Sequence, residues 1–402
     1  MNIWIIRHYT LINSRPHIWA KELVKRGHNV TLFASSFNHQ TFKEEHLQKG
    51  ESCREEILDG VKFIWLRGIP YKTNDWRRYL GTIEFTLRAI WIGLKQNDKP
   101  DTIIGTVVHP FAPAAAYVLS RFKKSRFNYE LNDVWPQVLV EEGVASEKAL
   151  MIRFLRFLER FLMKRANRIQ SILPHVGDYL DDIGILHEKF IWVPNPITPE
   201  LFADIEPYTG TKDGKFKIIF ITTFPPNPIN FDVILDAAEL LQKENTSNFE
   251  LVFVGDGRSR AEVEERSRKM RLDNVRFTGW IPKDQLYKVM KDASAFLVTA
   301  KPYRIHRYGV AYNKLYTSFM GKRPIIFTSF DPRNPVATAK AGITIQDGKP
   351  VEIVDAVKNL MSMSVEEISL MGMNGYKYAM NNHHIQVSVD RLLAAVGKFE
   401  KE

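Results

Sequence analysis

The chain has little cysteine and no long apolar run, which argues against a disulfide-linked secreted protein and against a membrane-spanning one. Its single cysteine, Cys53, has no partner for an internal disulfide, which favours a reducing compartment. No segment reaches the roughly 18 consecutive apolar residues of a membrane-spanning helix. The opening run Met1-Asn-Ile-Trp-Ile-Ile-Arg7 is too short for a secretory signal. We therefore expect a cytoplasmic protein.

The sequence also lacks a His/Cys/Asp cluster with metal-ligand spacing and lacks recognisable nucleic-acid-binding motifs. We accordingly expect no metal, no other cofactor and no nucleic-acid partner. What it does have is a formal net charge of +10, which favours an anionic partner such as a phosphorylated substrate or an anionic membrane surface. The alternative is a solvated basic surface that has no specific partner.

A length of 402 residues exceeds what one hydrophobic core usually serves, so two domains are expected. Short apolar segments alternate with segments of helical periodicity, the pattern of α/β proteins with doubly wound parallel sheets. The predicted strands of a first series are residues 2–7, 29–35, 61–66, 102–108, 126–131, 168–173 and 189–193. Those of a second series are 216–221, 249–254, 275–277, 295–298, 324–327 and 343–345.

A linker signature separates the two series. The segment Val193-Pro-Asn-Pro-Ile-Thr-Pro-Glu200 carries three prolines, and a polar Gly/Thr/Lys stretch follows at 207–214. We predict two Rossmann-like domains, residues 1–198 and 199–385, facing each other across a cleft.

Two predicted helices, 150–165 and 76–95, are apolar with interspersed Arg and Lys. Basic amphipathic helices can lie in an anionic membrane interface, and Trp76, Tyr79 and Trp91 suit such a position. The alternative for both is a helix that packs against the core and has a solvated edge.

Two glycine-containing segments follow strands of the second series. Phe253-Val-Gly-Asp-Gly-Arg-Ser-Arg260 would let backbone N–H groups approach a phosphate, with Arg258 or Arg260 neutralising its charge. The segment 307–326 reads as a glycine-containing loop, a short helix opened by Asn313, and an apolar strand after Pro324. A helix start behind a loop again presents free N–H groups.

These segments, in this order, resemble retaining GT-B glycosyltransferases of family four, especially the branch that adds amino sugars to bacterial surface polysaccharides. The resemblance covers nearly the whole chain. Its matching segments are 22–30, 35–39, 108–111, 130–136, 158–161, 193–196, 254–257, 275–279 and 308–314. It implies an N-terminal acceptor-binding domain, a C-terminal nucleotide-sugar-binding domain, and a C-terminal helix, 386–402, that packs back on the first domain.

The resemblance also implies roles for individual residues. Donor-binding residues would be Arg258, Arg260, Gly279, Ile281, Gly309, Asn313, Lys314 and Thr317. His109 matches the histidine near the donor sugar, and Asp133 lies in the acidic turn that faces the acceptor; we take both as catalytic. Each has a structural alternative, since His109 could bond backbone and Asp133 could begin a helix.

The sequence departs from the family pattern at three places. The family carries two glutamates eight residues apart in the donor turn, and here Gly309 and Thr317 stand at those positions. A threonine makes one hydroxyl contact where a carboxylate accepts two hydrogen bonds from the ribose. The glycine-rich turn after the first strand is replaced by Arg7–Arg15, and the loop 222–228 lacks the usual Arg and Lys.

The expected function is glycosyl transfer with retention and without a metal. The donor would be a UDP-linked hexose or N-acetylhexosamine, and the acceptor a lipid-linked or growing glycan at the inner membrane face. An oxocarbenium-like sugar would form while fixed cations stabilise the leaving diphosphate. No backside nucleophile is evident, which favours attack on the front face assisted by the leaving phosphate. A UDP-sugar epimerase of the same fold and a non-catalytic sugar-nucleotide or glycan-binding module stay open as alternatives.

Overall fold

A computed structural model describes residues 1–39, 41–71, 76–107, 109–211, 213–225, 231–244, 246, 248–300 and 303–397. The side chains of Trp76 and Tyr79, Val108, and the end of the 222–228 loop lie outside the described residues. The chain divides into two compact units. Unit 1 comprises Met1–Pro196 with Ile385–Glu402, and unit 2 comprises Ile197–His384.

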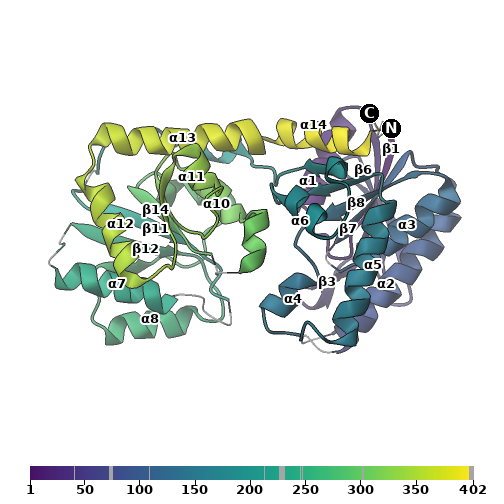
Figure 1. Cartoon of the computed structure of the whole chain (residues 1–402), viewed down its shortest axis with the longest axis horizontal. Coiled ribbons are helices and arrows are strands. Elements are labelled where there is room, and N and C mark those ends of the chain that lie inside the picture. The colour runs from purple at the N-terminus through teal and green to yellow at the C-terminus, as the bar shows by residue number, and fades with distance from the viewer. Residues whose placement is uncertain are drawn as a thin grey trace. The chain divides into compact units, whose positions relative to one another are not determined.

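Unit 1 contains an eight-stranded sheet in the order β10-β9-β8-β7-β1-β2-β6-β5, parallel except for β5 (Figure 1). The strands are β1 Asn2–Ile6, β2 Asn29–Ser35, β5 Cys53–Leu58, β6 Val61–Leu66, β7 Thr102–Val107, β8 Arg126–Leu131, β9 Arg168–Ser171 and β10 Phe190–Trp192. A separate antiparallel pair consists of β3 Phe37–Asn38 and β4 Lys43–Glu44.

Helices cover both faces of this sheet. They are α1 Arg15–Lys25, α2 Trp76–Lys95, α3 Phe111–Lys123, α4 Gln137–Glu141, α5 Leu150–Arg165, α6 Val176–Asp182 and α14 Ile385–Val396. Trp19 of α1 and Leu392 of α14 pack with Ile3 and Ile5 of β1 on one face. On the other face α3 packs on β7 and β8 and contacts both α2 and α5. Alternate residues of each strand therefore serve two different helical layers.

The edge strand β5 was not predicted. Its sequence, Cys53-Arg-Glu-Glu-Ile-Leu58, lacks a buried apolar face, and Ile57 is exposed. It pairs antiparallel with β6 and closes that edge of the sheet with charged side chains, a common way of blocking further strand pairing.

Unit 2 contains a six-stranded, wholly parallel sheet in the order β13-β12-β11-β14-β15-β16. The strands are β11 Phe216–Ile221, β12 Phe249–Val254, β13 Val275–Phe277, β14 Ala295–Val298, β15 Ile325–Thr328 and β16 Gly342–Ile345. The helices are α7 Phe231–Lys243, α8 Arg260–Lys269, α9 Tyr287–Met290, α10 Asn313–Phe319, α11 Pro335–Ala339, α12 Pro350–Ser362 and α13 Val365–His383.

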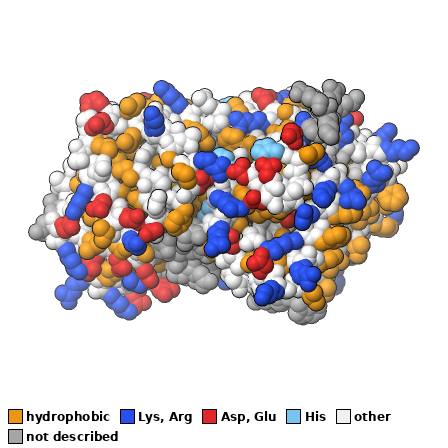
Figure 2. Space-filling model, viewed as in Figure 1, with side chains coloured by type: hydrophobic (Ala, Val, Ile, Leu, Met, Phe, Trp, Pro, Cys, Tyr) orange, Lys and Arg blue, Asp and Glu red, His pale blue; other side chains and the backbone are white. Residues whose placement is uncertain are grey.

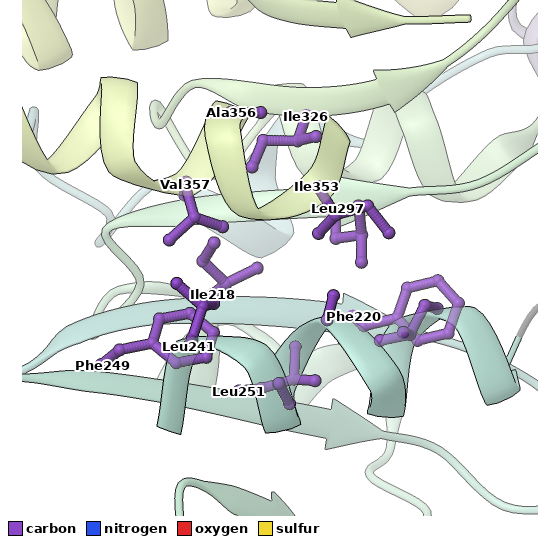
Figure 3. Close-up of a cluster of buried hydrophobic side chains, with 14 of the residues drawn as sticks. Ile218, Phe220, Leu241, Phe249, Leu251, Leu297, Ile326, Ile353, Ala356 and Val357 are labelled. Atoms are coloured by element: carbon purple, nitrogen blue, oxygen red, sulfur yellow. The ribbon is translucent and has the colours of Figure 1, made fainter. Parts of the chain in front are cut away.

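One core cluster of unit 2 shows how this sheet is sealed. Ile218 and Leu251 from the strands meet Leu241 of α7 and Val357 of α12, all nearly inaccessible to water (Figure 3). Each such buried side chain contributes about 1.5–3 kcal/mol relative to exposure. This packing fixes the apolar strands, and the loops at their carboxyl ends lie where open α/β sheets generally bind ligands.

The predicted fold class is confirmed: both units are Rossmann-like, with parallel strands between helical layers. Seven predicted strands have their exact observed bounds. None of the described helices has both the length and the apolar composition to span a membrane.

Candidate functional site

The segment Gly255-Asp-Gly257, here called the glycine turn, follows β12 in unit 2 and contacts the loop after β11. The Gly255 N–H donates to the Gly279 carbonyl at 2.9 Å, which ties this turn to the loop after β13. At Gly257 (φ +154°) an added Cβ would lie 2.0 Å from the Thr223 carbonyl oxygen. Only glycine fits there, because both the backbone angle and the close approach exclude a side chain.

Arg260 and Gly279 lie together beside this turn. A Cβ on Gly279 would stand 2.9 Å from Nη1 of Arg260, so the glycine makes room for the guanidinium. Two carboxylates hold this cation: Glu264 accepts from Nε at 2.7 Å, and Asp256 lies 3.5 Å from Nη1. Arg260 is therefore presented beside the glycine turn, as phosphate binding would require.

Three of the predicted donor residues share one face of α10. The helix begins at Asn313, and Lys314 and Thr317 lie one turn apart on the side that the core leaves accessible. Lys314 donates to Oγ1 of Thr223 at 3.4 Å, and burial lowers its pKa. Gly309, before this helix, is buried with φ +106°. Lys314 thus approaches the same loop that touches the glycine turn.

The remaining two predicted donor residues, Arg258 and Ile281, lie in the same two loops, after β12 and after β13. Arg258 is exposed, and Ile281 is half-buried two residues after Gly279. Sequence reasoning had passed over Thr223 and Glu264, which contact Lys314 and Arg260 respectively. Glu264 was detectable in principle, since it stands four residues after Arg260 on a helix.

In unit 1, His109 forms part of a buried histidine pair. Its Nε2 lies 2.9 Å from Nδ1 of His8, so one nitrogen donates to the other. Burial lowers the pKa of His109 to about 3, and burial followed by the neighbouring His109 lowers that of His8 well below its ordinary range. The pair is therefore neutral at physiological pH. Nδ1 of His109 is buried and has no hydrogen-bond partner among the described residues.

His8 is fixed from both sides by aromatic rings. It stacks on Tyr9 at 4.2 Å and on Phe85 of α2 at 4.6 Å between ring centroids. The carboxyl ends of β1 and β7 lie side by side, which brings His8 and His109 together although 101 residues separate them. A lone histidine after β1 gave no signal of this contact in the sequence.

Asp133, the other predicted catalytic residue, lies near two arginines. Burial by the surrounding protein raises the pKa of its carboxyl group, while Arg15 and Arg7 act in the opposite direction. Its side chain is nevertheless exposed, so water tempers the rise. Arg15 is itself paired with Glu130 and Asn132. The structure therefore places His109 and Asp133 at the same carboxyl edge of the sheet. His109 lies beside His8, and Asp133 lies near Arg7 and Arg15, to which the sequence analysis had assigned no role.

Two family matches cover most of the chain. The family described as Glycosyltransferase Family 4 matches residues 17–201, and the family described as Glycosyl transferases group 1 matches residues 215–363. The chain belongs to the glycosyltransferases of the family-four type. No curated protein matches its sequence as a relative.

Solved structures show that this glycosyltransferase has the GT-B fold. A sucrose-phosphate synthase from Thermosynechococcus elongatus has a TM-score of 0.71 at 13% identity, covering 97% of each chain. WaaG, a glycosyltransferase involved in lipopolysaccharide biosynthesis, has a TM-score of 0.67 at 14% identity, covering 99% of this chain and 100% of its own. HepE of Anabaena, solved with UDP and glucose, has a TM-score of 0.63 at 10% identity over 98% of each chain.

Proposed function

We propose that this glycosyltransferase moves a sugar from a UDP-linked donor to a lipid-linked or growing glycan, with retention and without a metal. The observation that carries the proposal is the convergence of Arg260, Lys314 and the glycine turn at the carboxyl edge of the unit 2 sheet. Two cations and exposed backbone at such an edge suit a nucleoside diphosphate. The UDP in the HepE structure supports the choice of nucleotide.

The chemistry follows from these residue types. The bond between the anomeric carbon and the diphosphate oxygen breaks, and its electron pair leaves with UDP. Arg260 and Lys314 would stabilise that charge. The acceptor oxygen then bonds to the same face of the sugar, and its proton passes to the leaving diphosphate. His109 stays neutral under these conditions, so its role would be to hold the donor sugar by a hydrogen bond rather than to act as a cationic acid.

The transferred group would be a hexose or an N-acetylhexosamine, as the resemblance to amino-sugar transferases of surface polysaccharides implies. The similarity to WaaG, which acts in lipopolysaccharide biosynthesis, is consistent with an envelope glycan as the acceptor. Thr317 would offer the ribose a single hydroxyl, so cations and backbone would supply most of the nucleotide affinity.

Calorimetric titration with UDP- and GDP-sugars tests the donor. We expect UDP-sugars to bind in the presence of EDTA, and R260M/K314M to weaken binding by about 100-fold or more, since hydrogen bonds to charged groups contribute about 1.5–3 kcal/mol each. The matched control is R268M/K269M, which removes two exposed cations of α8. Turnover with a glycan acceptor supports the transferase, interconversion without an acceptor indicates an epimerase, and binding without either indicates a binding module. Absence of nucleotide binding contradicts the proposal.

A further inference from the structure

The helix α2 carries several large apolar side chains on its outer face. Its inner, buried face consists of the small or polar residues Thr82, Thr86, Ala89 and Gly93 together with Phe85 and Ile92. Its outer face exposes one stripe at helical spacing, namely Leu80, Ile83, Leu87, Trp91 and Leu94. Leu87 is 62% exposed and Trp91 52%. The inner face packs closely, since a Cβ on Gly93 would meet Leu119 of α3 at 2.7 Å. The core of unit 1 therefore does not account for this stripe.

The neighbouring helices continue the apolar surface. On α5, Leu150, Phe154 and Phe157 fall on one exposed side, and Phe157 is 65% exposed. Phe161 follows on that side and contacts Tyr117 of α3 at 5.8 Å between ring centroids, which links the two helices. Phe122, at the end of α3, is 69% exposed. We call the exposed sides of α2, α3 and α5 the outer helical face.

Positive charge accompanies these apolar residues. The three helices together contain eleven Lys and Arg residues against two Glu, a formal charge of +9 in a chain whose total is +10. One of the two acids, Glu159, is buried, and the other, Glu84, pairs with Arg88. Figure 2 shows apolar and basic side chains intermingled on the side of unit 1 where Figure 1 places these helices.

Basic residues also border the apolar stripes at defined positions. Arg153, Arg160 and Lys164 lie along one side of the α5 stripe, and Nζ of Lys95 sits 3.6 Å from the centroid of the Trp91 ring. Beyond the end of α3 an open pocket of about 690 Å³ is lined by Lys99, Arg121, Lys124 and Arg126 together with Asp101, Ser120, Ser125 and Pro100. Such a pocket suits an anionic phosphate group.

We propose that the outer helical face binds an anionic phospholipid bilayer. Exposed Leu, Phe and Trp beside Lys and Arg match the boundary between acyl chains and anionic headgroups. A second copy of this face would bring two strongly positive surfaces together, and nucleic acid would leave the apolar stripes in water. The anionic cytoplasmic leaflet of a membrane satisfies both features. This inference goes beyond the proposed function, because it rests on the surface of unit 1 alone.

Sedimentation with vesicles tests the proposal. The probes are vesicles of phosphatidylglycerol with phosphatidylcholine, and of phosphatidylcholine alone. We expect the full chain to bind the anionic vesicles at least about tenfold more tightly, and salt to weaken this binding. L87N/W91N should lower the affinity about tenfold or more, and R153Q/R160Q/K164Q should reduce the salt dependence in part, since the other cations of the three helices remain.

Matched controls come from unit 2. V351N/L370N replaces two apolar residues of similar exposure, and R268Q/K269Q/R271Q replaces three exposed cations; neither should change vesicle binding. Circular dichroism confirms that each variant is folded, and UDP affinity is measured in parallel so that the donor site is assessed independently. Failure to bind anionic vesicles, or equal losses in test and control variants, overturns the proposal. The proposal is also overturned if the wild type forms a dimer without lipid and does not bind vesicles, and if L87N/W91N converts this dimer to a monomer.

Discussion

Replacing Glu159 with glutamine would remove a buried carboxyl group whose ionisation opposes folding. Glu159 is on the inner side of α5 and is 1% exposed. The Tyr179 hydroxyl donates to its Oε2 at 2.7 Å, whereas Oε1 has no partner among the described residues. Burial raises the pKa of this carboxyl from 4.5 to about 8, and the Tyr179 hydrogen bond opposes only part of the rise. Glutamine can accept the same hydrogen bond without a charge.

The pH dependence follows from proton counting. In the unfolded chain this carboxyl loses its proton near pH 4.5, but in the folded protein it keeps the proton to about pH 8. The folded state therefore binds one more proton in this window, and its free energy of unfolding falls as pH rises. At about 1.4 kcal/mol per pH unit, the cost reaches about 5 kcal/mol by pH 8. Below the unfolded pKa both states are protonated, and the cost disappears.

Urea unfolding followed by tryptophan fluorescence measures this effect in the relevant unit. Seven of the eight tryptophans belong to unit 1, and the eighth, Trp280, belongs to unit 2 and can be changed to Phe in every variant. We expect E159Q to exceed the parent in stability by several kcal/mol near pH 8, with the gap closing toward about pH 5. E188Q, at an exposed acid of unit 1, serves as the control. A gap of equal size at both pH values would refute the titration of Glu159.

Three further predictions concern the candidate site. G257A should reduce stability by about 1–3 kcal/mol and UDP affinity about tenfold, because its Cβ collides with the loop after β11; unchanged UDP titrations would contradict the role of this turn. H8F keeps the stacking on Tyr9 and Phe85 but removes the hydrogen bond to His109, so kcat/KM should fall about 5–100-fold. H8N should retain part of the activity. Equal rates in H8F and the parent would show that His8 is not a positioning residue. T317E should tighten UDP binding, as calorimetry would show, if its side chain reaches the ribose; no gain would place the ribose elsewhere.

The sequence was a good guide wherever apolar runs were continuous. Strands such as β11 and β12 are largely apolar and buried along nearly their whole length, and their composition marks both ends. β5 escaped prediction because an edge strand buries little and its residues read as a charged loop. The helix α14 begins at Ile385, one residue before the start at 386 that the resemblance had implied.

The candidate site was only partly predictable for a different reason. Arg260, Gly279 and Lys314 follow strands and carry familiar chemistry, so local sequence and resemblance were sufficient to select them. The contact between His8 and His109 depends on the register of β1 against β7, which no local pattern encodes. The same holds for Thr223, which belongs to the candidate site only because Lys314 and Gly257 approach it in the folded chain.

The return of α14 to unit 1 has a consequence for biosynthesis. The Trp19 indole donates to Ser388 at 2.8 Å, and Leu392 lies in the same core as Leu23. The ribosome delivers these α14 residues only after the whole of unit 2, which is continuous in sequence. Unit 2 can therefore complete its core during synthesis, whereas the earlier-made unit 1 waits with its α1 face uncovered. We expect the domain that begins first to finish folding last, and chaperones to meet that uncovered face in the interval.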